Sequence, residues 1–364
     1  MSEHLRVALT LEQCWHRVPG GTAVAALGMA RALKARADVE PVGVTALHRT
    51  TPARWAPPIE VHALPLPRLA LYEAWHRLRR PAVQVATGTV DVVHATTIAM
   101  PPRSAPLVVT MHDLAWVHDP AHFTARGVRF FERGLALALE DADLVLCSSQ
   151  ATLRDCEAAG FGRDRLRLVP LGVEVTSASE ETVERVRRRY GLERPYVLWT
   201  GTVEPRKNLA GLLRAFEDVE ADADLVLVGP RGWNQDLGAL VAGATRVRTL
   251  GFVPSADLGA LYAGARLFCF PSLLEGFGFP VLEAMAHGTP VVTSKGTSTE
   301  ELGGEAAVLV DPRDPASIAS GLQLVLSDDG LARRLAAAGR ERAARFSWER
   351  CGDLVRRAYA EAAA

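Results

Sequence analysis

Short apolar runs alternate with longer amphipathic segments along the whole chain. Three of these runs, Leu5–Thr10, Leu107–Met111 and Leu267–Phe270, are each followed by polar residues, glycine or proline within a few positions. Near-continuous apolar strands are typical of parallel sheets that helices cover on both faces. The pattern therefore predicts an α/β fold whose ligands bind beyond the carboxyl ends of its strands.

The other expected elements follow the same alternation. Helices are expected at 23–37, at 209–219, and from 348 to about 362, where the apolar residues recur with helical spacing. Helix starts are marked by residues that cap well, namely Thr22, Ser148 or Ser149, Asp314 and Ser347. Further strands are expected at 41–47, 90–95, 144–148, 196–201, 225–229, 247–250, 290–294 and 308–311.

The chain is long enough for two domains. Its 364 residues allow each domain to bury its own core. Segment 168–174 and the polar stretch 176–184 form the expected linker. We therefore expect one domain at 1–172 and a second at 173–346.

A strand, a glycine-containing loop, a helix and another strand follow one another between residues 267 and 294. Pro271 and Ser272 end the first strand, and Gly276 and Gly278 lie in the loop. Pro280 suits the first position of a helix, and Gly288 the position just past its end. This order of elements builds an anion site at a helix N-terminus.

Two glutamates frame this segment, Glu275 in the loop and Glu283 in the helix. A carboxylate can accept hydrogen bonds from two neighbouring hydroxyls of a sugar or ribose, each worth about 1.5–3 kcal/mol. The alternative is a capping loop residue and a solvent-facing helix residue, as isolated glutamates usually are. Because the helix around Glu283 is largely apolar, we expect that carboxylate to be partly buried and in need of partners.

The segment from Glu275 to Glu283, Glu-Gly-Phe-Gly-Phe-Pro-Val-Leu-Glu, resembles the E-x7-E signature of retaining, nucleotide-sugar-dependent glycosyltransferases of the GT-B fold. That large family includes bacterial mannosyltransferases. The resemblance implies two Rossmann-like, doubly wound domains that face each other across a cleft. It also implies that helix 347–364 packs back on the first domain, which supplies the acceptor side, while the second binds the nucleotide sugar.

A second resembling segment runs from Gly201 to Leu209 and contains the pair Arg206-Lys207. The departing nucleoside diphosphate develops negative charge, which fixed cations stabilise. Many relatives place the arginine nearer the glycine, where this chain has Thr202. Leu171 likewise stands where the family commonly has asparagine. The donor-binding residues implied by the resemblance are Gly201, Arg206, Lys207, Phe252, Val253, Glu275, Gly276, Phe277, Gly278, Leu282 and Glu283.

In the first domain the resemblance points to two places. His112 and Asp113 directly follow the strand Leu107–Met111, and the family's corresponding histidine touches the donor sugar. The Gly20-Gly21 pair is expected in a turn that faces the cleft, on the acceptor side. The implied catalytic set is therefore His112, Arg206, Lys207 and Glu275.

The composition of the chain limits the partners, compartment and cofactors that we expect. The formal net charge of −1 argues against nucleic acid as the main partner. Five scattered cysteines without CxxC spacing, and no visible signal peptide or membrane span, are expected of a cytoplasmic protein with reduced thiols. Nine of the ten histidines lie in the first 122 residues, but their spacing fits no common zinc pattern, so neither a metal nor another cofactor is expected.

The expected reaction is retaining transfer of a hexose to a glycan, lipid-linked or small-molecule acceptor. The Glu-Pro-Arg-Lys-Asn form of segment 204–208 resembles a mannosyltransferase-like branch and favours GDP-mannose as donor, while UDP- and ADP-sugars use the same motifs. A non-catalytic nucleotide-sugar-binding protein and a nucleotide-sugar epimerase remain alternatives. The absence of G-x-G-x-x-G after the first strand disfavours a dehydrogenase.

Segment 65–84 mixes aromatic and basic residues, among them Arg68, Tyr72, Trp75 and Arg77. Such a segment is either a solvated helix face with a buried aromatic stripe, or a surface that contacts the acceptor or lipid headgroups at the inner face of the membrane. The oligomeric state is not indicated by any pattern in the chain.

Overall fold

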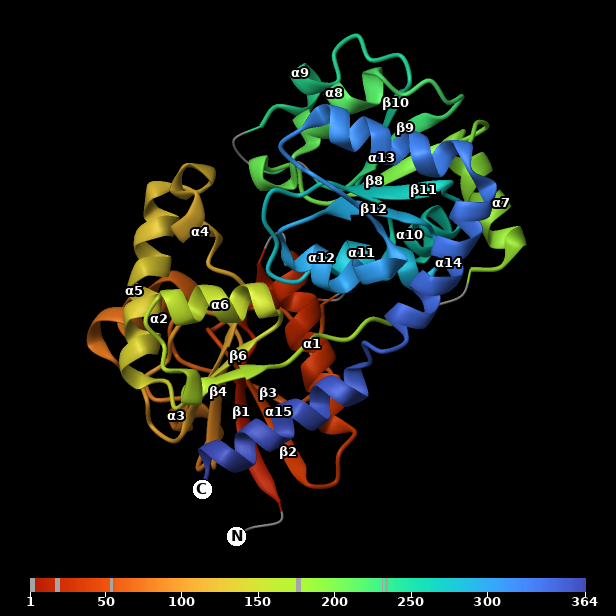
Figure 1. Cartoon of the computed structure of the whole chain (residues 1–364). Coiled ribbons are helices and arrows are strands. Elements are labelled where there is room, and N and C mark those ends of the chain that lie inside the picture. The colour runs from red at the N-terminus through yellow and green to blue at the C-terminus, as the bar shows by residue number, and fades with distance from the viewer. Residues whose placement is uncertain (1–3, 17–19, 53–54, 175–177, 231, 233–234) are drawn as a thin grey trace. The chain divides into compact units, whose positions relative to one another are not determined.

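The computed structural model describes residues 4–16, 20–52, 55–174, 178–230, 232 and 235–364. The chain divides into two compact units, each built on one parallel sheet (Figure 1). Unit 1 comprises Met1–Gly172 and Ser347–Ala364, and unit 2 comprises Val173–Phe346. The prediction of two Rossmann-like, doubly wound domains is confirmed in this respect.

Unit 1 has a seven-stranded sheet in the order β3-β2-β1-β4-β5-β6-β7. The strand order reverses between β1 and β4. In sheets of this kind, ligands bind at the carboxyl ends of the strands beside this reversal. Its strands are β1 (Leu5–Thr10), β2 (Val39–Thr45), β3 (Val61–Ala63), β4 (Val92–Ala95), β5 (Leu107–Met111), β6 (Leu144–Cys147) and β7 (Leu166–Leu168). Its α-helices are α1 (Gly20–Lys34), α2 (Arg68–Glu73), α3 (Gln84–Thr87), α4 (Ala115–His118), α5 (Ala125–Asp141), α6 (Gln150–Ala158) and α15 (Trp348–Ala362).

Unit 2 has a six-stranded sheet in the order β10-β9-β8-β11-β12-β13, which reverses between β8 and β11. Its strands are β8 (Tyr196–Thr200), β9 (Asp224–Val228), β10 (Val247–Gly251), β11 (Leu267–Phe270), β12 (Val291–Ser294) and β13 (Val308–Val310). Its α-helices are α7 (Glu180–Tyr190), α8 (Leu209–Glu217), α9 (Leu237–Leu240), α10 (Ser255–Ala263), α11 (Phe279–Ala286), α12 (Ser298–Gly303), α13 (Pro315–Ser327) and α14 (Asp329–Ala343).

The last helix, α15, belongs to unit 1 although the chain reaches it from unit 2. Ser347 caps it by accepting a hydrogen bond from the Arg350 N–H, as its sequence predicts. Helix α15 packs along α1, where a side chain at Gly28 would collide with the Trp348 ring. Tyr359 binds the buried His94 through a 2.7 Å contact between its hydroxyl and Nδ1. These contacts join the two ends of the chain in one core.

Several local predictions are confirmed. The strands Leu5–Thr10, Leu107–Met111 and Leu267–Phe270 have the expected bounds. Ser149 caps α6 by accepting from the Thr152 N–H, and Asp314 caps α13 by accepting from the Ala316 N–H.

Two local predictions are wrong. Gly20 and Gly21 open helix α1 and do not form a turn before it, so Thr22 lies inside the helix and is not its cap. The apolar pattern begins only at Ala23, and glycine's low helix propensity hid the first turn. Residues 180–184 of the expected linker form the start of helix α7, capped by Ser179. This helix has only one buried residue, Val186, so its sequence is polar enough to resemble a linker.

The aromatic and basic segment 65–84 folds as α2 followed by a π-helical turn, Ala74–Leu78. Trp75 is only 1% exposed, and its indole N–H donates to the Pro81 carbonyl at 3.0 Å. Arg77 is exposed and pairs with Glu73 one turn earlier. The tryptophan therefore belongs to the core, with charge on the outside. In the described part of the chain, no helix is long and apolar enough to cross a membrane.

Candidate functional site

The reversal of strand order in unit 2 places two loops side by side. The loop after β8 begins at Gly201, and the loop after β11 begins at Pro271. Since β8 and β11 are adjacent and parallel, their carboxyl ends lie at the same edge of the sheet. The two segments that resemble glycosyltransferase motifs, 201–209 and 275–283, therefore meet although they lie far apart in the sequence.

The first loop holds its two cations in a single turn of 3₁₀ helix, Pro205–Lys207. Asn208 follows in a left-handed conformation, with φ of 54°. Its side-chain amide donates to the carbonyl oxygens of Pro271 at 3.0 Å and of Pro312 at 2.6 Å. Asn208 thus fastens the cationic turn to the loop after β11.

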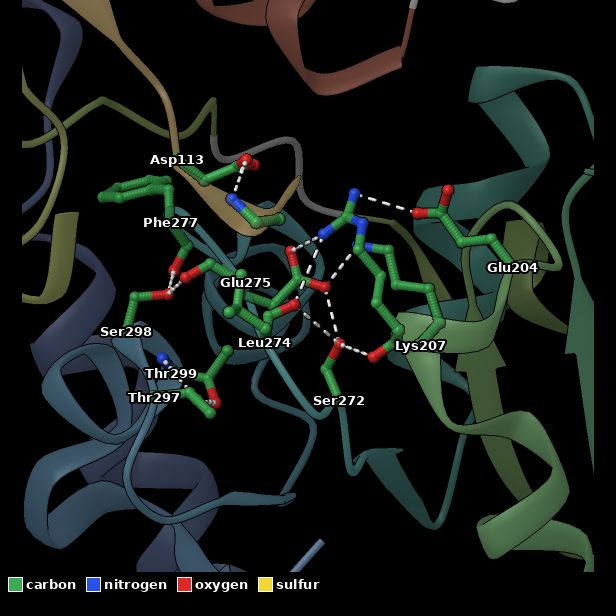
Figure 2. Close-up of polar contacts among 12 residues, drawn as sticks. Asp113, Glu204, Lys207, Ser272, Leu274, Glu275, Phe277, Thr297, Ser298 and Thr299 are labelled. Carbon is green, nitrogen blue, oxygen red and sulfur yellow. Dashed lines mark hydrogen bonds and ion pairs between the residues drawn. The ribbon is translucent and has the colours of Figure 1, made fainter. Parts of the chain in front are cut away.

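Glu275 lies at the centre of the polar contacts drawn in Figure 2. One of its carboxylate oxygens accepts from Lys207 Nζ and, at 2.7 Å, from the Ser272 hydroxyl. The other accepts from Arg206 Nη1 at 3.2 Å. Arg206 also pairs with Glu204 at 2.9 Å. Glu275 and Lys207 are each only 8% exposed, so this is a buried ion cluster.

The cluster keeps its charges because they compensate one another. Burial by itself raises the pKa of the Glu275 carboxyl, but the charges of Lys207 and Arg206 outweigh it and lower that pKa overall. Burial and the nearby Arg206 lower the pKa of Lys207, while Glu275 and Glu204 oppose that shift. Two cations and two carboxylates thus stand together at the end of β8, and an anionic ligand can exchange for a carboxylate as partner of Arg206 and Lys207.

The glycine loop leads directly into α11. Gly278 has φ of 108° and precedes the first helical residue, and a side chain there would come within 2.8 Å of Thr299. Only glycine fits both constraints without strain. The Ser298 hydroxyl lies 2.8 Å from the carbonyl oxygen of Glu275 and 3.0 Å from that of Phe277 (Figure 2). The loop is therefore held in one conformation at the positive end of the helix dipole.

Glu283 has a different environment in the middle of α11. Its Oε2 atom accepts from the Tyr262 hydroxyl at 2.8 Å, and that hydroxyl also lies 2.8 Å from Thr200 Oγ1. Burial raises the pKa of the Glu283 carboxyl, and the hydrogen bond from Tyr262 only partly opposes the rise. No cation within the described part of unit 2 pairs with Glu283. It is half-buried, as its apolar helix predicted.

The other donor residues implied by the sequence differ in what their side chains can reach. Phe252 follows β10 and is 63% exposed, so its ring is open to a ligand. The side chains of Val253 and Leu282 are buried in the core, and only their backbone can meet a ligand. Phe277 packs between Phe279 and Phe346, with centroid distances of 5.2 and 6.2 Å. At Gly201, a side chain would lie 3.4 Å from the ring of Trp199.

In unit 1, His112 stands at the carboxyl end of β5, as predicted. Its Nε2 atom lies 3.0 Å from the Thr96 carbonyl, so Nε2 donates and Nδ1 is left as an acceptor in the neutral ring. Burial lowers the pKa of His112 and favours that neutral ring, although the Thr96 hydrogen bond and Asp113 oppose the shift. Asp113 accepts from the Ala115 N–H at 3.1 Å. Gly20 and Gly21 lie in the first turn of α1.

Three residues of the site were not singled out from the sequence: Glu204, Ser272 and Tyr262. Glu204 lies within the resembling segment 201–209, and Ser272 ends the predicted strand three residues before Glu275, so the position of each was a usable signal. Tyr262 gives no such signal, because it lies in a different helix from Glu283. Within the described ranges, no group of three or more His, Cys, Asp or Glu side chains is placed to hold a metal ion.

Comparison with known proteins agrees with this geometry. The family model of glycosyl transferases group 1 matches residues 194–328, and that of the glycosyl transferase 4-like domain matches residues 20–172. O-antigen chain mannosyltransferase B of Escherichia coli is 35% identical over 303 residues, which are 79% of this chain and 80% of that protein. The chain belongs to the group 1 glycosyltransferases.

Two further relatives of this glycosyltransferase are named a D-inositol 3-phosphate glycosyltransferase and a mannosyltransferase. D-inositol 3-phosphate glycosyltransferase of Xylanimonas cellulosilytica is 31% identical over 76% of this chain and 73% of that protein. The serotype-specific mannosyltransferase WbdA of Escherichia coli is 29% identical over 71% of this chain, which spans only 34% of WbdA.

Solved structures agree on the fold. Anabaena HepE, crystallised in complex with UDP-glucose, superposes with a TM-score of 0.78 over 98% of this chain and 100% of that chain, at 20% identity. The lipopolysaccharide glycosyltransferase WaaG superposes with a TM-score of 0.69 over 93% of this chain and 95% of that chain. The GT-B fold of this glycosyltransferase is thereby established.

Proposed function

We propose that this glycosyltransferase transfers a hexose, mannose from GDP-mannose, to a glycan, lipid-linked or small-molecule acceptor with retention at the anomeric carbon. The observation that carries the proposal is the buried cluster of Glu275, Lys207 and Arg206 at the point where the strand order of unit 2 reverses. Such a cluster supplies fixed cations where a nucleoside diphosphate leaves.

The donor follows from likeness rather than from base-reading contacts. The relative with 35% identity is named a mannosyltransferase of the O-antigen chain. The structure of HepE contains UDP-glucose, so a UDP-sugar is the main competing donor, followed by an ADP-sugar. The same relative supports a cell-envelope polysaccharide as acceptor.

Each site residue has one role in the proposal. Arg206 and Lys207 hold the leaving diphosphate together with the N-terminus of α11. Glu275 holds sugar hydroxyls, and Glu283 holds the ribose hydroxyls. We assign His112, Asp113 and the Gly20-Gly21 turn of α1 in unit 1 to the sugar and acceptor side.

The chemistry needs no general base from the protein. As the bond from the anomeric carbon to the phosphate oxygen breaks, the acceptor oxygen bonds to the same face of that carbon. The acceptor's proton passes to the departing phosphate oxygen. The two cations and the helix dipole supply the charge compensation that a metal supplies in other transferases.

The state of the cysteines supports a cytoplasmic location for the reaction. All five, Cys14, Cys147, Cys156, Cys269 and Cys351, are buried free thiols. Reduced thiols are typical of the cytoplasm, and we place the reaction there. A lipid-linked acceptor would bring the protein into weak contact with the inner face of the membrane.

A donor panel tests the proposal. GDP-, UDP-, ADP- and dTDP-sugars are added without metal, and both binding and release of free nucleotide are followed. Selective binding with slow release from GDP-mannose is expected, accelerated by an acceptor mixture. Release from a UDP- or ADP-sugar alone would overturn the donor assignment. Binding without any release would favour a non-catalytic nucleotide-sugar-binding protein, and no binding would overturn the proposal.

A further inference from the structure

Three polar side chains from three elements of unit 2 form a hydrogen-bonded row. Thr200 is the last residue of β8, Tyr262 lies in α10, and Glu283 lies in α11. The Tyr262 hydroxyl lies 2.8 Å from both Thr200 Oγ1 and Glu283 Oε2. The row reaches from the end of the central strand to the glutamate that the proposed function assigns to the ribose.

The row has a direction. An ionised carboxylate only accepts hydrogen bonds, and a phenol has a single proton to donate. Tyr262 therefore donates to Glu283, and Thr200 must donate to Tyr262. Burial raises the pKa of the Tyr262 phenol well above its ordinary range, so the phenol keeps its proton.

Tyr262 is held on all sides. It is 1% exposed, its ring stacks on His287 with centroids 5.8 Å apart, and it meets the Phe268 ring in a T-shaped contact with centroids 5.5 Å apart. Its backbone carbonyl accepts from the Thr289 hydroxyl at 2.6 Å. The phenol oxygen is consequently fixed before any ligand arrives.

Glu283, by contrast, is anchored at one oxygen only. Within the part of unit 2 that the structure describes, Tyr262 is the hydrogen-bond partner of its Oε2, and its Oε1 accepts no hydrogen bond. Glu283 as a residue is half-buried, and Oε1 is not among the buried polar atoms that lack a partner, so a ligand can reach this oxygen. A carboxylate held at one oxygen presents the other in a fixed direction.

We propose that Tyr262, supported by Thr200, is a positioning residue that orients Glu283 Oε1 toward the vicinal hydroxyls of the donor ribose. This inference rests on the proposed function, in which Glu283 binds those hydroxyls. Tyr262 itself touches neither the donor nor the reacting atoms. Tyr262 restricts Glu283 to few rotamers before the donor binds, and so lowers the conformational entropy that Glu283 loses on binding.

A purely structural role for the Tyr262 hydroxyl makes a different prediction. Buried tyrosines commonly satisfy their hydroxyl with the nearest acceptor, and loss of that bond then weakens the fold without selecting among ligands. The positioning role instead weakens only those ligands that carry ribose hydroxyls. The two are separated by comparing GDP with 2′,3′-dideoxy-GDP, or the UDP pair where the protein binds UDP.

The experiment measures the Kd of both nucleotides by calorimetry for the wild type and four variants. Tyr262→Phe removes only the hydroxyl and should weaken GDP about tenfold while changing dideoxy-GDP less than about twofold. Thr200→Val should weaken GDP in the same selective manner by about two- to threefold. Tyr196→Phe is the matched control, because its equally buried hydroxyl donates to the Leu261 carbonyl and not to Glu283. It should leave the ratio of the two Kd values unchanged.

Glu283→Gln separates failure of this inference from failure of the proposed function. If that variant keeps the full preference for GDP over dideoxy-GDP, the ribose does not bind at Glu283 and the proposed function is wrong on this point. If Glu283→Gln loses the preference but Tyr262→Phe and Thr200→Val keep it, only the positioning role is overturned. Equal weakening of both nucleotides in Tyr262→Phe would likewise overturn it.

Discussion

The two glutamates of the E-x7-E segment lie in the same unit but are stabilised in opposite ways. Glu275 is surrounded by Lys207, Arg206 and Ser272, and both of its oxygens are engaged. Glu283 has one phenol as partner and keeps an open oxygen. Correspondingly, the pKa of Glu275 is lowered and that of Glu283 is raised. Glu275 therefore compensates two cations, whereas Glu283 faces no cation in the described part of unit 2 and has one oxygen without a protein partner.

The largest effect is expected from removing the carboxylate that organises the cations. Glu275→Ala leaves Arg206 and Lys207 close together with their main partner lost. Breaking a buried ion pair from one side costs about 3–5 kcal/mol. For a unit of this size the loss corresponds to a fall in Tm of about 10 °C. Calorimetric unfolding measures it, with Glu283→Gln as the control that should shift Tm by less than about 2 °C. An unchanged Tm in Glu275→Ala would remove the distinction between the two carboxylates.

The next effect concerns catalysis at the cationic turn. Lys207→Ala should lower kcat by about a hundredfold, because a fixed cation at the leaving group stabilises the transition state more than the ground state. The KM for the donor should change much less. Lys295→Ala is the matched control, since Lys295 is an exposed lysine of the same unit. Near-normal kcat in Lys207→Ala would show that the pair with Glu275 is structural only.

A smaller effect is expected at the open carboxylate. Glu283→Gln should weaken nucleotide binding about tenfold, the value of one charge-assisted hydrogen bond. Stability should be unchanged or slightly higher, because a buried carboxylate without a cation is costly to keep ionised. Direct nucleotide titration together with Tm distinguishes this variant from Glu275→Ala. A large loss of Tm would mean that Glu283 is as structural as Glu275.

The smallest effect is a pH dependence that the two carboxylates should not share. The raised pKa of Glu283 means that it takes up a proton at a higher pH than an ordinary glutamate, so donor affinity should fall severalfold as the pH decreases from neutral. The lowered pKa of Glu275 keeps it ionised over the same interval, so Glu275 should cause no loss of Tm, while protonation of Glu283 itself should raise Tm slightly. Dideoxynucleotide binding controls for titration of the phosphate. If the affinities of the nucleotide and of its dideoxy form fell equally with pH, the titrating group would not be Glu283.

Much of the fold could be predicted because its signals are local. The buried strand Leu267–Phe270, the caps at Ser149, Asp314 and Ser347, and the loop at Gly278 are each written in a few consecutive residues. The errors were local as well. Glycines at the start of α1 and polar residues at the start of α7 have compositions typical of loops. In α1 the packing of the later turns outweighs that preference, and α7 begins at a cap, Ser179.

The sequence by itself determined the alternation of strands and helices, the family, and the two motifs that contain Arg206, Lys207, Glu275 and Glu283. These depend on spacing along the chain, which a single sequence displays directly. Only the tertiary structure decided that Lys207 pairs with Glu275, 68 residues away, and that the Tyr262 hydroxyl donates to Glu283. Such pairs depend on which strands become neighbours. The adjacency of β8 and β11 arises from packing over the whole sheet, and no residue in either strand specifies it alone.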